Sequence, residues 1–306
     1  MKLFVAVTDK SWYRTLRKNS FDEVNFWQPN NQNVFRAVEP GDLFLFKLHA
    51  PINSIVGFAV FARQVKLPLS LTWESFGQKN GVNSYEEFCQ SILRYRNGKQ
   101  REIDPIISSL ILTSPQFWNE NDWIASPRSW ASSIVQGKTY RDGDQDFDYL
   151  LGSVKYRITP CLSTGEDRFG KPILVQPRLG QASFRMIVTS AYHSRCAISG
   201  EKTLPVLEAA HIKPYHLDGP HEVPNGILLR QDFHTLYDKG FITITNDFHV
   251  EVSKRIKELY GNGKAYYEYH GKPVFNLPES RLDKPSRDFL SWHNENVYID
   301  SRSRLP

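Results

Sequence analysis

Two patterns of hydrophobic residues follow one another along the chain, and the first is a series of short strands. Apolar runs at residues 3–7, 43–48 and 55–62 are separated by turns that contain Pro and Gly. Such closely spaced runs are typical of β-strands, and residues 11–18 are expected to form a helix between the first two. The pattern predicts a small mixed β-barrel with helices at its rim.

The second pattern predicts two strands followed by a helix. Residues 206–212 form a mostly apolar run that ends at Lys213-Pro214, because proline cannot donate a hydrogen bond to a strand pair. A second short apolar run covers residues 227–229. Residues 231–239 then show helical spacing, and Gly240 stands where a glycine commonly ends a helix.

Polar residues lie at defined points of this second segment. His211 comes at the end of the first predicted strand. His234 and Asp238 are four residues apart on the predicted helix, so their side chains share one face. The segment resembles the HNH (ββα-metal) nuclease motif at all three named positions, which are His211, Asn225 and His234 in AAHIKP…NG…LLRQDFHTLYD.

This resemblance implies a role for each residue. His211 would be the general base, and Asn225 would hold the loop so that His211 stays in position. His234 would serve catalysis as a metal ligand, with Asp238 as a second ligand. The residue types suit phosphodiester hydrolysis, in which neutral imidazole activates water and a cation neutralises the charge that develops on the phosphate.

The metal ligands are the point at which the sequence departs from the motif. Many members carry Asp or His directly before the base, where this chain has Ala210. Glu208 would project to the same face of the strand, but it lies two residues back. Water and phosphate would then complete the coordination shell, which favours Mg²⁺, with Mn²⁺ as a substitute. Cys196 stands where some relatives begin a zinc-binding pair, but Ser199 breaks that pair, so no structural zinc is expected.

Composition narrows the class of protein. The chain has 306 residues, of which 40% are hydrophobic and 13% aromatic, and this indicates a folded protein large enough for two domains. The formal net charge of +5 suits a polyanionic partner and equally suits an ordinary enzyme. The three cysteines form no disulfide framework. No apolar run approaches membrane-spanning length and the opening is too short for a signal sequence, so a soluble, cytoplasmic protein is expected.

Aromatic residues in the front half suggest a site for an extruded base. Trp27 and Trp73 lie in segments that look like loops, where burial explains a large aromatic side chain less readily. Stacking on such rings, with amides near the base edge, is how proteins hold an extruded base. The alternative is that these side chains belong to the core.

The front half also resembles a known family over roughly its first 150 residues. The segments VNFWQP, PGDLFLFKLH, IVGFAVF and WESFGQKNG are similar to the EVE domain of the PUA-like superfamily. Members of that superfamily recognise modified bases, often by flipping them into an aromatic pocket. On this resemblance the stacking candidates are Trp27 and Trp73, the weaker edge-reading candidates are Asn25 and Glu74, and the reserves are Tyr13 and Phe46.

The expected fold is α+β in three parts. Residues 1–150 would form the EVE/PUA-like domain, a mixed β-barrel with peripheral helices. Residues 151–180 mix charge, Gly and Pro and would form a connector. Residues 181–306 would form the HNH (ββα-metal) domain, similar to the module that follows EVE domains in modification-dependent restriction endonucleases.

Together, the resemblances imply a modification-dependent DNA endonuclease. It would recognise 5-methyl- or 5-hydroxymethylcytosine in double-stranded DNA by base flipping and hydrolyse phosphodiester bonds in its HNH domain. Because each chain has one active site and both strands must be cut, a homodimer or two independent nicks are expected. Two alternatives stay open: a non-catalytic reader of modified DNA with a degenerate nuclease domain, which Ala210 favours, and an unselective HNH nuclease.

Overall fold

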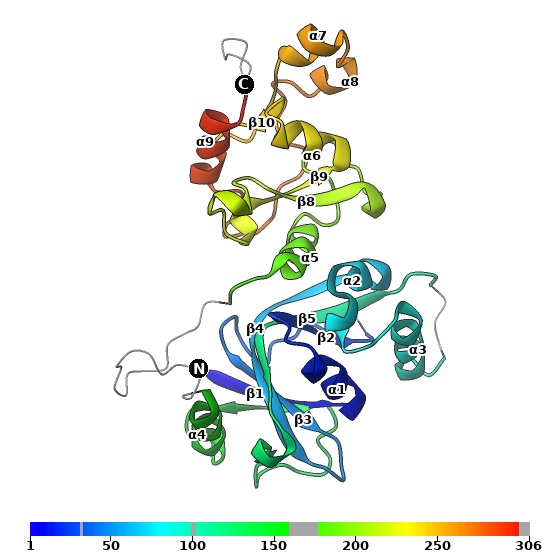
Figure 1. Cartoon of the computed structure of the whole chain (residues 1–306), viewed down its shortest axis with the longest axis vertical. Coiled ribbons are helices and arrows are strands. Elements are labelled where there is room, and N and C mark those ends of the chain that lie inside the picture. The colour runs from blue at the N-terminus through cyan, green and yellow to red at the C-terminus, as the bar shows by residue number, and fades with distance from the viewer. Residues whose placement is uncertain (31–32, 99–101, 159–176, 300–306) are drawn as a thin grey trace. The chain divides into compact units, whose positions relative to one another are not determined.

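The structure is a computed structural model that describes residues 1–30, 33–98, 102–158 and 177–299 (Figure 1). It divides into two compact units, Met1–Ser183 and Phe184–Pro306. Residues 159–176, which make up much of the predicted connector, lie outside the described residues. The predicted α+β class is confirmed, because both units combine helices with strands.

The first unit is built on one mixed sheet of seven strands. The strands are β1 (Lys2–Thr8), β2 (Glu23–Gln28), β3 (Leu43–Leu48), β4 (Ser54–Pro68), β5 (Ile106–Phe117), β6 (Ile124–Ala125) and β7 (Gly137–Arg141). They are hydrogen-bonded in the order β2-β5-β4-β3-β1-β7, and β6 pairs with β4. β1 and β3 run parallel, whereas the other pairs are antiparallel. The three apolar runs predicted as strands are confirmed as β1, β3 and β4.

The sheet does not close into the predicted barrel. β2 and β7 stand at the two ends of the strand order, and no pairing joins them within the described residues. β2 ends at Gln28, and the next residue, Pro29, has no N–H with which to extend the pairing. Residues of β1, β2 and β7 line a common pocket instead.

Helices cover both faces of this sheet (Figure 1). They are α1 (Lys10–Lys18), α2 (Leu69–Phe76), α3 (Tyr85–Tyr95) and α4 (Phe147–Ile158), with 3₁₀ turns η1 (Gly77–Asn80) and η2 (Glu120–Asp122). Side chains alternate along β1, so Phe4 and Ala6 join the core on the α1 side. Leu3 and Val5 point the other way and join the core on the α4 side. The predicted helix at residues 11–18 is confirmed as α1.

Trp27 and Trp73 lie in regular elements, not in the predicted loops. Trp27 is in β2, opposite Ser109 of β5. This pairing joins distant parts of the chain, so the local sequence gives no signal of it. Trp73 is in α2, which packs through Leu69 into a core cluster with Phe88 of α3. Tertiary packing thus decides the conformation of both segments.

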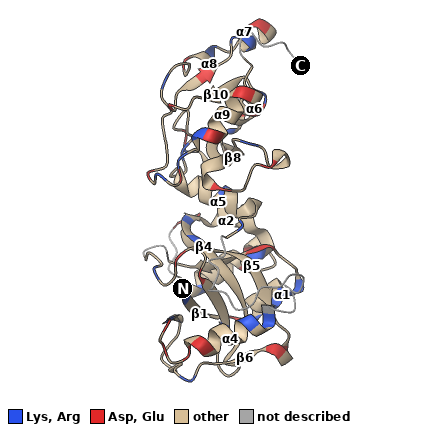
Figure 2. Cartoon of the chain, turned by 90° about the vertical axis from the view of Figure 1, so that its left-hand side faces the viewer, with Lys and Arg blue, Asp and Glu red and all other residues tan. Residues whose placement is uncertain are grey.

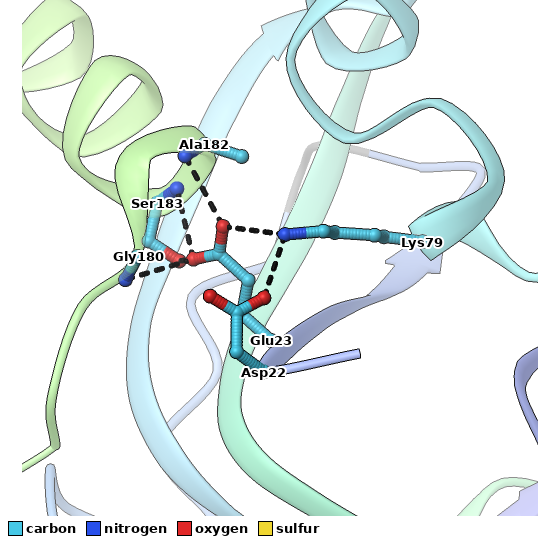
Figure 3. A network of polar contacts seen from close by, with 6 residues as sticks. All are labelled: Asp22, Glu23, Lys79, Gly180, Ala182 and Ser183. Carbon is cyan, nitrogen blue, oxygen red and sulfur yellow. Dashed lines mark hydrogen bonds and ion pairs between the residues drawn. The ribbon is translucent and has the colours of Figure 1, made fainter. Parts of the chain in front are cut away.

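The carboxylate of Glu23 is buried and bonds to the last residues of the first unit (Figure 3). Glu23 is fully buried and accepts hydrogen bonds from the backbone N–H groups of Gly180, Ala182 and Ser183, each at 3.1 Å, and from the Ser183 hydroxyl. Lys79 Nζ lies 3.1 Å from the same carboxylate. Ala182 and Ser183 are in the first turn of α5 (Gln181–Ala191) and Gly180 directly precedes it, and at this end a helix has no internal acceptors for its N–H groups. A Cβ at Gly180 would lie 2.6 Å from Glu23 Cδ, so the close approach requires glycine.

The second unit contains the strand, strand and helix that the sequence predicts. After α5 its elements are η4 (Leu204–Val206), β8 (Leu207–His211), η5 (Tyr215–Leu217), η6 (Val223–Asn225), β9 (Gly226–Arg230), α6 (Gln231–Asp238), β10 (Ile242–Ile244), β11 (Val250–Val252), α7 (Arg255–Tyr260), α8 (Lys264–Tyr267) and α9 (Arg287–Asn296). β8 pairs with β9, and β10 pairs with β11, both antiparallel. Gly240 follows α6 with φ 72°, and a Cβ there would lie 2.0 Å from the Val297 carbonyl oxygen. Only glycine meets both conditions.

Candidate functional site

The β8–β9 connection places His211 at the end of its strand and folds back over it. His211 is paired with Gly226, so the loop of residues 212–225 leaves and returns at the same point. Asn225 is fully buried at the end of this loop. Its Oδ1 accepts from the Lys213 N–H at 2.8 Å, and its Nδ2 donates to the carbonyls of Lys213 and Pro220, both at 2.9 Å. The Asn225 amide therefore joins both arms of the loop.

The imidazole of His211 is held on two sides. Its ring stacks on Phe184, with centroids 3.9 Å apart and planes within 9°. Its Nε2 lies 2.9 Å from Nδ1 of His221. Burial lowers the pKa of His211 to about 4, and the nearby His221 and His234 add to this effect. His211 is consequently neutral at pH 7, which is the form that can accept a proton.

His234 on α6 lies between two carboxylates. Its Nδ1 is 2.6 Å from Glu208 Oε2, and its Nε2 is 3.3 Å from Asp238 Oδ2. Desolvation raises the pKa of Asp238, the neighbouring His234 opposes this shift, and Glu208 adds to it. The sequence placed Glu208 two residues behind the expected ligand position, but its side chain is long enough to reach the helix. A β-strand directs alternate residues to one face, which is the signal that identifies Glu208.

These side chains border one pocket of about 350 Å³. Three of the four residues predicted for the nuclease site line it, namely His211, His234 and Asp238. Asn225 is not among the lining residues and instead bonds to the loop. Tyr215, His216 and His293 also line it, and no pattern in the sequence marks them.

The donors at this pocket fit a hard divalent cation with few protein ligands. No group of three or more His, Cys, Asp or Glu side chains in the described part of the chain is arranged to hold a metal. His234 Nε2 and Asp238 Oδ2 are the two donors that face the pocket together. Glu208 on the opposite ring nitrogen is the arrangement that commonly orients a metal-binding histidine. Two protein donors leave most of the shell to water and phosphate, as magnesium tolerates.

A second, larger pocket of about 640 Å³ lies in the first unit. Its walls include aromatic side chains from α1, β1, β2 and the segment after β2: Phe4, Trp12, Phe26, Trp27 and Phe35. Polar groups at the same pocket include Asp9, Gln28 and Gln136. The pocket thus combines ring faces with hydrogen-bonding groups.

Asp9 presents an acceptor to this second pocket. Its Oδ2 accepts from the Tyr95 hydroxyl at 2.5 Å, and its Oδ1 lies 3.6 Å from His49 Nε2. Burial raises the pKa of Tyr95 to about 12, and the hydrogen bond to Asp9 adds to this, so Tyr95 remains the donor. Neither Asp9 nor Tyr95 was marked by the sequence, because they approach each other only in the fold.

Of the six residues predicted for base binding, the structure places Trp27 at this pocket. Its indole N–H donates to the Asn80 carbonyl at 2.9 Å, and its ring meets Phe88 and Tyr95 edge-on. The other five do not line the pocket. Asn25 is buried and bonded to Asn80 and Ser109, and Trp73 packs on Tyr85 and Phe88. Tyr13 and Phe46 are in the core, and Glu74 is exposed.

Comparisons with known proteins identify the second unit's central segment. Residues 196–245 match the family model described as HNH endonuclease. The match contains His211, Asn225, His234 and Asp238, and it confirms the predicted resemblance to HNH endonucleases over these residues. No curated protein sequence matches the chain.

Two solved structures show a similarity to this chain. A point mutant of an ASCH protein from Zymomonas mobilis is 11% identical over 52% of this chain and 98% of its own, with a TM-score of 0.32. The modification-dependent TagI restriction endonuclease is 12% identical over 97% of this chain and 84% of its own, with a TM-score of 0.28. Within the described residues no helix has the length and apolar content that a membrane crossing requires.

Proposed function

We propose that the chain is a modification-dependent DNA endonuclease in which the first unit recognises a modified cytosine and the second hydrolyses the backbone. The observation that carries the nuclease half is the pocket on which His211, His234 and Asp238 converge inside the HNH endonuclease segment. A base and a cation-binding pair at one pocket are what hydrolysis of a phosphodiester requires.

In this mechanism His211 takes a proton from the attacking water. Its depressed pKa keeps the ring neutral, and stacking on Phe184 holds its plane. Asn225 maintains the loop that fixes the ring's position. His234 and Asp238 would hold a divalent cation, Mg²⁺ by preference, with Glu208 orienting His234. That cation would neutralise charge on the phosphate and on the departing oxygen.

The larger pocket is the proposed site of the extruded base. Its volume of about 640 Å³ accommodates a pyrimidine, and Trp27 with Trp12 and Phe26 offers ring faces for stacking. The Asp9 carboxylate can accept a hydrogen bond from the exocyclic amino group of cytosine, as acidic side chains do in base recognition. A substituent at C5, methyl or hydroxymethyl, would occupy the remaining space.

Helix α1 beside this pocket supplies a surface suited to the DNA backbone. Trp12 of α1 lines the pocket, and Arg14, Arg17 and Lys18 of the same helix are exposed. Figure 2 marks Lys and Arg positions on α1 in blue. Cations at this place would contact phosphates on either side of an extruded nucleotide. The partner is therefore proposed to be double-stranded DNA. Since each chain has one nuclease pocket, cleavage of both strands would involve a homodimer or two separate nicks.

A second candidate function is a non-catalytic reader of modified DNA. The observation that favours it is the lack, among the described residues, of any three side chains grouped to hold a metal. Ala210, fully buried, offers no donor. In that case the second unit would bind DNA without cutting it.

The deciding experiment compares plasmids that carry 5-methylcytosine, 5-hydroxymethylcytosine or unmodified cytosine, each with Mg²⁺, Mn²⁺ or EDTA. We expect cleavage of a modified plasmid in the presence of a divalent cation, and binding without cleavage by His211→Ala. Binding without cleavage by the wild type under every metal would establish the reader. Equal cleavage of modified and unmodified plasmid would establish an unselective nuclease.

A further inference from the structure

We propose that His221 is a positioning residue that holds the imidazole of His211 in the tautomer and orientation that proton abstraction needs. This inference rests on the proposed nuclease function. The contact that carries it joins Nε2 of His211 to Nδ1 of His221 at 2.9 Å, a normal hydrogen-bond length. His221 has no place in the HNH pattern, and its sequence context does not distinguish it from the chain's other histidines.

The direction of this hydrogen bond determines whether His211 can act as a base. Two neutral imidazoles need one donor and one acceptor. If His221 Nδ1 accepts, His211 carries its proton on Nε2, and Nδ1 of His211 keeps a free lone pair. In the opposite arrangement His211 would carry its proton on Nδ1 and use Nε2 as an acceptor, so neither nitrogen could take a proton from water. Within the described residues Nδ1 of His211 has no hydrogen-bond partner, and His211 lines the pocket.

When neutral, His221 would also offer an acceptor to the charged form of the base, whereas a charged His221 repels it and so lowers the pKa of His211. When His211 takes a proton on Nδ1, its Nε2–H becomes a donor on a cation, and a hydrogen bond to the neutral Nδ1 of His221 becomes charge-assisted. The proton from the attacking water would then be on His211, which returns it to solvent after product leaves, while the departing oxygen takes its proton from solvent water. The two rings are tilted by 57°, with centroids 5.0 Å apart, so they do not stack on each other.

The loop holds His221 as firmly as it holds His211. The ring of His221 stacks on Tyr215, with centroids 4.3 Å apart and planes within 11°. Pro220, the preceding residue, gives its carbonyl to Asn225 Nδ2 at 2.9 Å. Since Asn225 also binds both backbone groups of Lys213, two residues after His211, one amide fixes the two arms that carry the two histidines.

Gly219 permits this return of the loop. A Cβ at Gly219 would lie 1.8 Å from the Lys213 carbonyl oxygen, and the Gly219 N–H donates to Pro214 at 3.0 Å. The His221 arm therefore passes against the His211 arm at a distance that only glycine allows. The pairing of the two histidines is a consequence of backbone packing.

The test compares His221→Ala and His221→Asn in the full chain. The amide oxygen of Asn lies where Nδ1 of histidine lies, so His221→Asn keeps the acceptor and His221→Ala removes it. We expect kcat on modified plasmid to fall about 10- to 100-fold in His221→Ala, with DNA affinity unchanged, and to recover most of this loss in His221→Asn. His249→Ala, at a partly exposed histidine of the same unit whose Nδ1 contacts the Asp247 carbonyl, is the control and should cleave normally. Wild-type cleavage by His221→Ala, or equal loss in both variants, overturns the proposal.

A spectroscopic measurement separates this inference from the nuclease proposal. In chain labelled with ¹⁵N-histidine, the Nε2–H of His211 should exchange slowly enough to be observed and should couple to Nδ1 of His221. The signal should disappear in His221→Ala. If the wild type cleaves no DNA, the nuclease proposal fails, while this signal still decides the inference. A His211 that carries its proton on Nδ1 would overturn the inference even in an active nuclease.

Discussion

Glu23 in the first unit and Asp238 in the second are carboxylates beside a cationic or ionisable side chain, but their surroundings differ. Glu23 is fully buried, and backbone N–H groups, a hydroxyl and Lys79 occupy both of its oxygens. Asp238 has 56% of its side chain exposed and meets one ring nitrogen of His234. Glu208, on the other nitrogen, is 44% exposed.

This difference distinguishes a carboxylate that stabilises the fold, Glu23, from one that is proposed to take part in the reaction, Asp238. A buried carboxylate is tolerated when hydrogen bonds and an ion pair replace the water it has lost, and Glu23 meets this condition. Asp238 lines a pocket, and repulsion from the neighbouring Glu208 contributes to the raised pKa of Asp238. A cation would relieve that repulsion. The Glu23 cluster needs no ligand, whereas we propose that the cluster around His234 binds a cation.

Asp238→Asn should give the largest effect, and it directly tests the cluster of Glu208, His234 and Asp238. Losing one of two proposed protein ligands should lower Mg²⁺-dependent cleavage about 1000-fold, which corresponds to ~4 kcal/mol. The free energy of unfolding without metal should not fall, because the substitution removes a repelled charge. Asp232→Asn, the same change on the same helix at a residue paired with Arg230, is the control. Equal losses of cleavage in the two variants would mean that the acidic residues of α6 only maintain the structure.

Glu23→Gln should have the opposite effect, because it should lower stability instead of cleavage. It places an amide N–H₂ against backbone N–H donors and should lower the free energy of unfolding by about 3 kcal/mol in urea denaturation. Asp22→Asn removes the other partner of Lys79, but Asp22 is 70% exposed, so its loss should be under about 1 kcal/mol. Similar losses in both variants would show that the backbone donors contribute little.

His293 and His211 have similarly depressed pKa values but differ in their hydrogen bonds. Burial lowers the pKa of His293 to about 4, like that of His211, although a hydrogen bond to the Tyr237 carbonyl opposes the shift. His293 differs because both nitrogens are occupied, Nδ1 by Thr243 at 2.8 Å and Nε2 by the Tyr237 carbonyl at 3.1 Å. We therefore expect His293 to affect stability and His211 to affect chemistry.

The pH dependence follows from the direction of the shift. The folded pKa of His293 lies below the unfolded value of about 6.5, so the unfolded chain binds the proton more readily. Its contribution is complete above pH 6.5 and is lost as pH falls towards 4. Between pH 7 and pH 5 it should lower the free energy of unfolding by about 2 kcal/mol. Urea denaturation of wild type and His293→Gln at both pH values measures it, and identical pH slopes in the two proteins would contradict the prediction.

Substitutions of Trp27 and Trp73 should give the smallest effect. The two residues again differ in that one borders a pocket and the other is packed among side chains. Both pack against Phe88, but only Trp27 lines the larger pocket. Trp27→Ala should lower the preference for modified over unmodified DNA about 10-fold, in keeping with the loss of one stacking partner. Trp73→Ala should cost stability and leave that preference unchanged. Competition binding with matched duplexes measures both, and an equal change of preference would place the base elsewhere.

The amino-acid sequence by itself determined the strand–strand–helix segment and its chemical residues. Strand, turn, helix and the Gly240 terminus depend on neighbours a few positions away, and His211, Asn225 and His234 keep a recognisable spacing on them. Local periodicity carries that information. It also identified α1, β1, β3 and β4.

Only the tertiary structure decided the open sheet, the larger pocket and the partners of the histidines. The pairings of β2 with β5 and of β1 with β7 join distant segments, and the walls of the pocket come from several of them. Glu208 meets His234, and His221 meets His211, because side chains of separate elements converge. The physical reason is that such contacts depend on packing and loop closure across the chain, whereas sequence periodicity reports on neighbours only.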